Sequence, residues 1–209
     1  MSINLQKGQR IDLTKGNAGL NKITVGLGWD PVQQQQKKSG GGFLGGLFGG
    51  GGSGGASANV DCDASVIMLK NDRLVAKNDV VYFGNLKGAN GAVAHSGDNL
   101  TGAGDGDDEQ IVIELKSIPS DYNRLIFVVN IYDAANRKQH FGMIQNAFIR
   151  IVNSSTNEEL LKYNLSDNYS DQTTLITGEI YRHGDEWKFG AIGTGTQDNS
   201  IGEVVKKYQ

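Results

Sequence analysis

The sequence has 209 residues, about the length of one domain, and 38% of them are hydrophobic. Lys and Arg total 20 against 23 Asp and Glu, a formal net charge of −3 that argues against a protein coating nucleic acid. No apolar run is long enough to cross a bilayer, and the single cysteine, Cys62, excludes internal disulfides and a zinc finger. The sequence also opens without the features of a signal peptide, so we expect a cytoplasmic protein without a transmembrane segment.

Short runs rich in β-branched and aromatic residues, separated by Gly, Asn and Asp clusters, predict strands. In chain order they are Leu20–Trp29, Val60–Lys70, Val80–Phe83, Ile111–Lys116, Leu125–Asp133, Ala147–Asn153, Thr173–Tyr181 and Trp187–Ile192. Glu158–Tyr163 fits a helical turn or a further strand, and Ser200–Tyr208 predicts a short C-terminal helix. No repeated βαβ pattern is present. We therefore predict an all-β fold, a single antiparallel β-sandwich of about eight or more short strands over residues 1–209.

A glutamine- and glycine-rich stretch interrupts this domain at about residues 33–58. Ordering such a stretch costs much backbone entropy, so we predict a flexible insertion. Its four large apolar residues have a spacing that one side of a helix could present: Phe43, Leu44, Leu47 and Phe48. They could form a tip that contacts a partner or a membrane. A solvated loop is the favoured interpretation, because each glycine weakens a helix by about 1 kcal/mol relative to alanine.

The densest group of acids lies between Asp98 and Glu109, inside a longer segment without Lys or Arg. It contains five carboxylates and one amide next to the first of them: Asp98, Asn99, Asp105, Asp107, Asp108 and Glu109. These charges repel one another, and a hard divalent cation with oxygen ligands would relieve the repulsion. The composition is that of a calcium loop but not of an EF-hand, because Leu100 and Gly102 stand where ligands belong. The alternative is a solvated acidic surface loop.

Further acids stand at the ends of predicted strands. Asp61 and Asp63 are two residues apart at the start of one strand, so both side chains project from the same face. Asp30 and Asp133 each close a strand, although Asp30 is the weaker candidate because a strand-end Asp can also cap a turn. Acids at strand ends and an acidic loop can converge on one end of a sandwich. The residues by themselves therefore predict a metal site.

Several motifs together resemble one known family. They are Gly26-Leu27-Gly28-Trp29-Asp30, Asp61-Cys62-Asp63-Ala64-Ser65, Gly97-Asp98-Asn99-Leu100-Thr101-Gly102, Gly104-Asp105-Gly106-Asp107-Asp108-Glu109, Phe127-Val128-Val129-Asn130-Ile131-Tyr132-Asp133, Asn146-Ala147-Phe148-Ile149-Arg150, Gly178-Glu179-Ile180-Tyr181-Arg182-His183 and Glu186-Trp187-Lys188-Phe189. In these motifs the sequence resembles the TerD family of tellurium-resistance and stress proteins. The resemblance covers nearly the whole chain except the glycine-rich stretch, and the insertion itself suggests a TerZ-like branch. Two departures are Cys62, where a larger apolar residue is usual, and Ala103, where an acid is often found.

The resemblance implies a bacterial, cytoplasmic β-sandwich that binds two calcium ions and takes part in resistance to tellurite, phage and colicins. It implies metal ligands at Asp61, Asp63, Asp98, Asn99, Asp107, Asp108 and Glu109, and extends to Asp105 and Asp133. It also implies partners among other tellurium-resistance proteins and at the inner membrane, with no nucleic acid.

The residues do not indicate an enzyme. The three histidines His95, His140 and His183 lie far apart in the sequence and form no metal-binding motif. The order His95, Ser96, Asp98 is weak evidence for a catalytic triad, because adjacent loop residues rarely reach its geometry. Two non-catalytic functions remain open: a calcium-dependent interaction module, and a C2-like sandwich that uses calcium to bind anionic membrane lipid.

Overall fold

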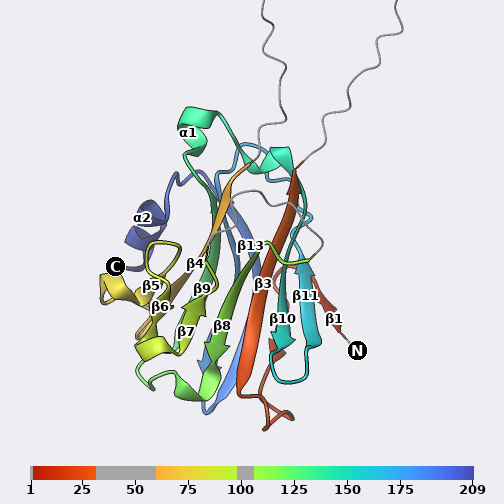
Figure 1. The fold of residues 1–209 in the computed structure, drawn as a ribbon, viewed down its shortest axis with the longest axis vertical. Helices are drawn as coiled ribbons and strands as arrows, with labels where there is room; N and C mark the ends of the chain where they lie inside the picture. Colours follow the sequence, from red (N-terminus) through yellow and green to blue (C-terminus); the bar gives the residue numbers. More distant parts are fainter. Residues whose placement is uncertain (1, 32–59, 98–105) are drawn as a thin grey trace, which may run out of the picture.

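The computed structural model describes residues 2–31, 60–97 and 106–209, and these form two β-sheets packed face to face (Figure 1). The seven-stranded sheet has, in spatial order, β1 (Ile3–Leu5), β11 (Glu158–Asn164), β10 (Ile144–Asn153), β3 (Lys22–Pro31), β8 (Glu109–Glu114), β7 (Val93–His95) and β6 (Lys87–Gly88). The six-stranded sheet has β2 (Arg10–Asp12), β13 (Glu186–Thr196), β12 (Thr174–His183), β9 (Arg124–Ile131), β4 (Cys62–Leu69) and β5 (Val80–Val81).

Helices are short and lie outside the sheets. They are α1 (Ala134–Arg137), α2 (Ile201–Val204) and the 3-10 turns Lys77–Asp79, Ala89–Gly91, Leu115–Ser117, Phe141–Met143 and Val205–Tyr208. The predicted antiparallel sandwich with a short C-terminal helix is confirmed, and Glu158–Tyr163 belongs to a strand. The glycine-rich stretch, including Phe43, Leu44, Leu47 and Phe48, lies outside the described residues, as do Asp98, Asn99 and Asp105.

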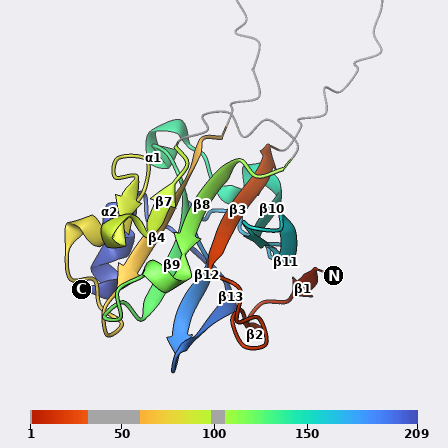
Figure 2. The same cartoon turned by 60° about the horizontal axis from the view of Figure 1, so that its bottom comes forward.

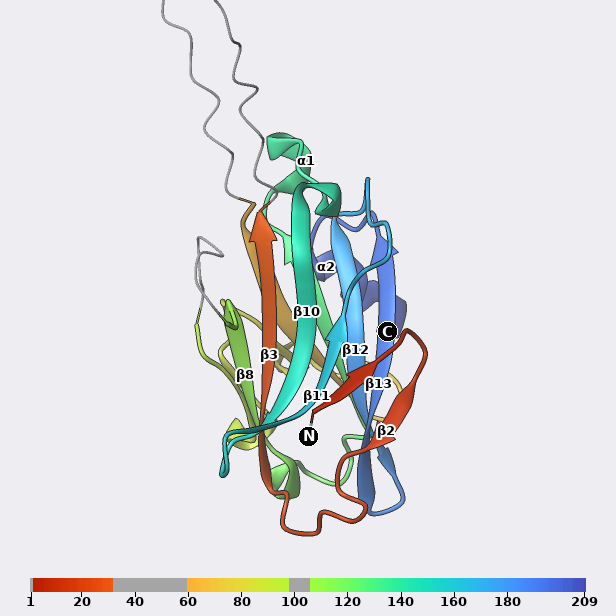
Figure 3. The same ribbon diagram turned by 90° about the vertical axis from the view of Figure 1, so that its right-hand side faces the viewer.

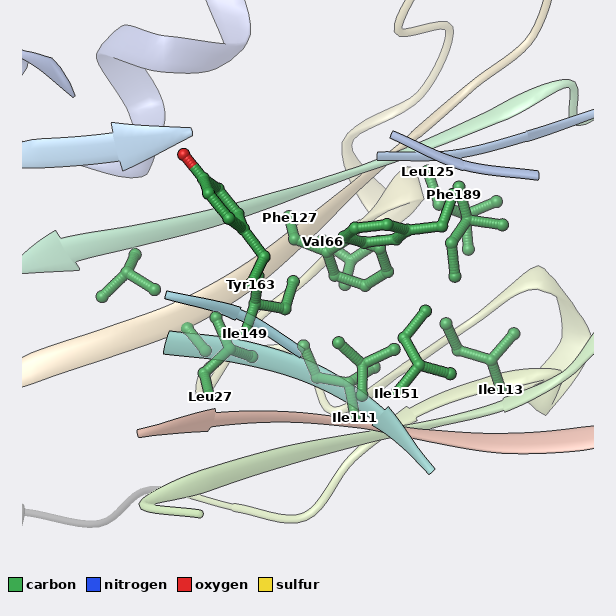
Figure 4. Close-up of a cluster of buried hydrophobic side chains, with 14 of the residues drawn as sticks. Leu27, Val66, Ile111, Ile113, Leu125, Phe127, Ile149, Ile151, Tyr163 and Phe189 are labelled. Atoms are coloured by element: carbon green, nitrogen blue, oxygen red, sulfur yellow. The ribbon is translucent and has the colours of Figure 1, made fainter. Parts of the chain in front are cut away.

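The alternation of side chains along the strands builds the core. In β3, Ile23, Val25 and Leu27 are at most 1% exposed and point between the sheets, whereas the intervening residues face outward. Figure 4 shows the result: Leu27 and Ile111 approach from one sheet, and Val66 and Phe127 from the other. Burying side chains of this size contributes about 1.5–3 kcal/mol each, so the interface between the sheets is the main source of stability.

A second, smaller apolar cluster lies on the outer face of the six-stranded sheet. It joins outward-facing side chains of β4 and β9, such as Ile67 and Val128, to Val204 of α2. The same cluster includes Val205 and Tyr208, and the backbone N–H of Leu74 donates to the Tyr208 carbonyl oxygen at 2.6 Å. The C-terminal segment is therefore a fixed cover of this face rather than a loose end.

The first two strands connect the sheets at one edge. β1 pairs in parallel with β11 at the edge of the seven-stranded sheet, and β2 pairs antiparallel with β13 at the edge of the other. Figures 2 and 3 show both strands on the same side of the molecule. Three-residue strands carry little periodic signal, which is why the sequence does not predict these two elements.

Candidate functional site: an acidic pole

The two sheets meet at the end of the sandwich where β3 and β9 finish and β4 and β8 begin, at the top of Figure 1. Glu109 of β8 joins them: it is 1% exposed, and its Oε2 accepts a hydrogen bond from the Ala64 backbone N–H of β4 at 2.5 Å. We call this end the acidic pole. Its described carboxylates are Asp30, Asp61, Asp63, Asp107, Asp108, Glu109 and Asp133.

A buried histidine supports the same junction. His95 Nδ1 accepts from the Gly97 backbone N–H at 3.0 Å, so its Nε2 carries the hydrogen. Nε2 lies 3.1 Å from the Ala64 carbonyl oxygen and 3.4 Å from Glu109 Oε2. Glu109 and His95 thus hold β8, β7 and β4 together behind the pole.

Asp107 is bound by a cation from the middle of the seven-stranded sheet. Its two oxygens accept from Arg150 Nε at 2.7 Å and Nη2 at 3.1 Å, and its side chain is only 1% exposed. This paired carboxylate lies directly over Gly26, where a Cβ would come within 2.2 Å of it. The glycine therefore makes room for Asp107, and a bidentate ion pair fixes the start of β8.

Asp108 is in a different electrostatic position. Its Oδ2 accepts from the Trp29 backbone N–H at 2.7 Å, which joins it to the end of β3. Burial raises the pKa of the Asp108 carboxyl above its usual range, and the negative charges of Asp30, Asp107 and Glu109 add to that shift although the hydrogen bond opposes it. Asp108 is therefore a carboxylate whose charge is disfavoured by its neighbours.

The residues of β4 show the same crowding from the other sheet. Burial raises the pKa of the Cys62 thiol well above its usual value, and the charges of Asp63, Asp61, Glu109 and Asp108 raise it further. Cys62 is fully buried, so it is a core residue of low reactivity. Four carboxylates from two sheets act on this one thiol. The sequence analysis expected the acids near the start of β4 and those of the acidic loop to lie at the same end of the sandwich. Asp61, Asp63, Asp108 and Glu109 do lie together there.

Three further acids of the pole, Asp61, Asp133 and Asp30, have polar partners. Arg137 Nη1 lies 3.4 Å from Asp61 Oδ2, and Asp133 accepts from the Asn136 side chain at 2.7 Å. Asp30 accepts from the Asn146 side chain at 2.8 Å. Within residues 2–31, 60–97 and 106–209, no three His, Cys, Asp or Glu side chains lie close enough together to hold one metal ion. The described carboxylates converge without forming a complete coordination site.

Sequence reasoning missed three residues that shape this pole: Arg150, His95 and Asn130. Arg150 and Asn130 interrupt otherwise apolar runs at positions that face away from the core. A polar residue inside an apolar run is the sequence feature that could have identified both residues. His95 was considered only as a weak catalytic-triad candidate, because its position in a short alternating strand is equally that of an ordinary core residue.

The protein is a two-layer β-sandwich in which carboxylates from both sheets lie at one end. A TerD domain model matches residues 1–208, and the chain belongs to this family. It is 59% identical over 208 residues to stress response protein SCP2 of Bacillus subtilis (strain 168), covering 100% of both chains. It is 39% identical to tellurium resistance protein TerD of Serratia marcescens, covering 93% of this chain and 91% of that one.

Solved structures agree with the fold. A homologue of the telluride resistance protein TerD from Streptomyces coelicolor A3(2) superposes with a TM-score of 0.65 at 20% identity, covering 91% of this chain and 99% of that one. The family is thus one of stress-response and tellurium-resistance proteins. Within the described residues no helix is long and apolar enough to span a membrane.

Proposed function

We propose that this chain is a calcium-binding protein without catalytic activity of its own, which acts in the stress response as a calcium-dependent interaction module. The observation that supports it is the convergence of Asp61, Asp63, Asp108 and Glu109 on Cys62 from two sheets. Crowded carboxylates with few cations nearby suit a divalent ion with oxygen ligands.

The described residues divide into two roles in this proposal. Asp107 is paired with Arg150, and Glu109 binds the Ala64 N–H, so both position the strands that carry the site. Asp61, Asp63 and Asp108 are the described residues proposed to contact calcium, with Asp30 and Asp133 at the rim. The acids of the 98–105 segment, Asp98 and Asp105, together with Asn99 complete the proposed ligand set, for two ions in all. When bound, calcium would neutralise these charges and leave a coordination position for an oxygen of a partner.

Thermal melting tests the metal site. A ligand that binds only the folded protein at about 100 times its Kd adds roughly 2.7 kcal/mol, which for a domain of this size raises Tm by roughly 5–10 °C. We expect calcium, but not magnesium, to produce such a shift relative to EDTA, and the triple variant Asp61→Asn, Asp63→Asn, Asp108→Asn to lose it.

The matched control is Asp185→Asn, which removes one exposed carboxylate from the turn between β12 and β13 at the other end of the sandwich. It should keep the full calcium shift. If calcium fails to raise the Tm of the unmodified protein, the carboxylates are a solvated rim and the calcium proposal is wrong.

The partners proposed are other tellurium-resistance proteins and a protein at the inner membrane. Direct contact with anionic lipid is the second candidate, and the observation that favours it is Tyr132, which is 47% exposed beside Asp133. Sedimentation with phosphatidylserine vesicles separates the two. Pelleting that requires both calcium and the anionic lipid would favour the lipid function, and its absence would favour a protein partner.

A further inference from the structure

A cavity of about 300 Å³ lies beside the acidic pole, on the outer face of the six-stranded sheet. Its floor includes Asp63 and Ser65 of β4 and Asn130 of β9. Asp63 and Asn130 stand opposite each other in the strand register, and both alternate with core residues such as Cys62 and Ile131. The floor is therefore a strip of polar side chains directed away from the core.

The C-terminal segment forms one wall. The hydroxyls of Thr173 and Thr174 donate to the Asp198 carbonyl oxygen at 2.7 and 2.8 Å. Thr174 is the register neighbour of Asn130 on the other side, so these bonds bring the following residues, Asn199 and Ser200, over the same strip. The wall is held by the sheet itself and persists without any ligand.

Asn130 presents an acceptor that nothing in the described part of the chain satisfies. The residue is 7% exposed, and its Oδ1 is buried without a hydrogen-bond partner. A buried carbonyl oxygen without a donor costs about 1–3 kcal/mol. A ligand that enters the cavity with an N–H or O–H group would remove this cost.

The rest of the lining is mostly aromatic, with Asp133 and Ile201 beside the rings. Tyr82, Phe83 and Tyr132 line the cavity, and Phe83 and Tyr132 are 45% and 47% exposed. Tyr82 and Phe83 pack edge to face with ring centres 5.2 Å apart, which fixes one wall. The Arg137 guanidinium already lies 5.0 Å from the Tyr132 ring centre, so this chain itself places a cation against one of these rings.

We propose that the cavity binds a primary ammonium group on an alkyl stem. An ammonium group has three donors and no acceptor, which matches the amide oxygen of Asn130 and the carboxylate of Asp63. The stem would lie along Tyr82 and Phe83, where its carbons are removed from water and its charge faces aromatic rings. A calcium ion would gain nothing from the rings of Tyr82 and Phe83. Asp63 is shared with the proposed calcium site, but Asn130 and the aromatic residues are not, so the inference goes beyond the proposed calcium function.

The same chemistry has two sources, a free alkylamine and a lysine side chain of a protein. Isothermal titration in EDTA with pentylamine and with Nα-acetyl-lysine methylamide tests both, and 1-pentanol is the neutral control. We expect saturable binding of the amines and none of the alcohol. Tighter binding of the lysine derivative would identify a protein side chain as the ligand, and tighter binding of pentylamine a free amine.

The variant Asn130→Leu should weaken amine binding about tenfold or more, because it removes a hydrogen bond to a charged group. It should melt no lower than the unmodified protein, because it removes an unsatisfied buried acceptor. Phe83→Ala, at a position that is 45% exposed, should weaken binding about two- to fivefold. Asn4→Leu, on the exposed edge strand β1, is the control and should bind as the unmodified protein does.

Two results would overturn the proposal: equal binding of pentanol and pentylamine, or unchanged amine binding in both Asn130→Leu and Phe83→Ala. A protein that binds the amine in EDTA but shows no calcium shift would contradict the calcium proposal alone. A calcium shift without amine binding would contradict only this one.

Discussion

The two ends of the sandwich differ in how far their charged side chains are paired with opposite charges. At the end opposite the acidic pole, Arg124 binds Glu179 at 2.7 Å and Asp72 at 2.9 Å, and Lys70 binds Asp121 at 2.7 Å. We call this the basal end. At the acidic pole, the described carboxylates outnumber the Lys and Arg side chains that pair with them. Burial and neighbouring negative charges raise the pKa of Asp108 there. The comparison teaches that the basal end is built for folding, whereas the pole keeps an excess of charge that folding alone does not explain.

Arg182 gives the largest expected effect. Its Nε and Nη2 donate to the carbonyl oxygens of Tyr122 and Ile118, each at 2.9 Å, and its guanidinium lies 4.2 Å from the centre of the Trp187 ring. Arg182→Ala leaves both carbonyls without this donor, so we expect a loss of about 3 kcal/mol in the free energy of unfolding, measured by urea denaturation. Arg182→Lys keeps the charge but not the fork of donors and should lose less. An unchanged urea midpoint in Arg182→Ala would show that the basal end does not depend on this residue.

Gly26 should give the next largest effect, this time at the pole. In Gly26→Ala the new Cβ would meet the Asp107 carboxylate at 2.2 Å and displace it from Arg150, so we expect a loss of about 1–3 kcal/mol. Gly19→Ala is the matched control, because no atom of the described residues beyond its two chain neighbours lies within 4 Å of a Cβ there. Calorimetry on the two variants measures the difference. Equal melting temperatures would mean that Asp107 can move without cost and that its ion pair does not fix β8.

Asp108 should give the smallest effect and the opposite sign. A carboxyl group whose pKa is raised in the folded state contributes stability below its unfolded pKa and loses it as the pH rises through the folded pKa. At neutral pH in EDTA, Asp108→Asn should therefore be more stable than the unmodified protein, by up to about 1 kcal/mol. The difference should vanish as the pH falls through the usual carboxyl range. Destabilisation by this substitution, with Asp185→Asn neutral, would show that the charge of Asp108 is already compensated.

Strand alternation revealed most of the fold but not how distant strands meet. The apolar run from Leu125 to Tyr132 predicts β9 because most of its residues are β-branched or aromatic, and the structure confirms the strand. Its neighbours in the sheet, β4 and β12, could not be read from the sequence, since a pairing depends on residues many positions away. The start of β10 was also placed late, because a bulge between Gln145 and Phe148 breaks its alternation.

The same limit applies to the candidate site. Acid content alone indicated which residues could gather, and Asp61, Asp63, Asp108 and Glu109 do act together on Cys62. Composition could not show that Asp107 is bound by an arginine 43 positions away. It also could not show that Asn130, in the middle of an apolar run, lies open to a cavity. Pairing between distant segments decides which carboxylates are structural and which remain available.

The two short strands at the edge have a consequence for how the protein forms. β1 pairs with β11, where Ile3 lies opposite Leu161, and β2 pairs with β13, where Arg10 lies opposite Gly190. Both strands therefore pair with residues more than 150 positions further along the chain. Contacts of such long range form late and slow the folding of β-proteins. During synthesis, β1 and β2 leave the ribosome first, and they stay without their partner strands until β11 and β13 have been made near the end of the chain. A chaperone that shields unpaired strands would have its longest opportunity at these two N-terminal segments.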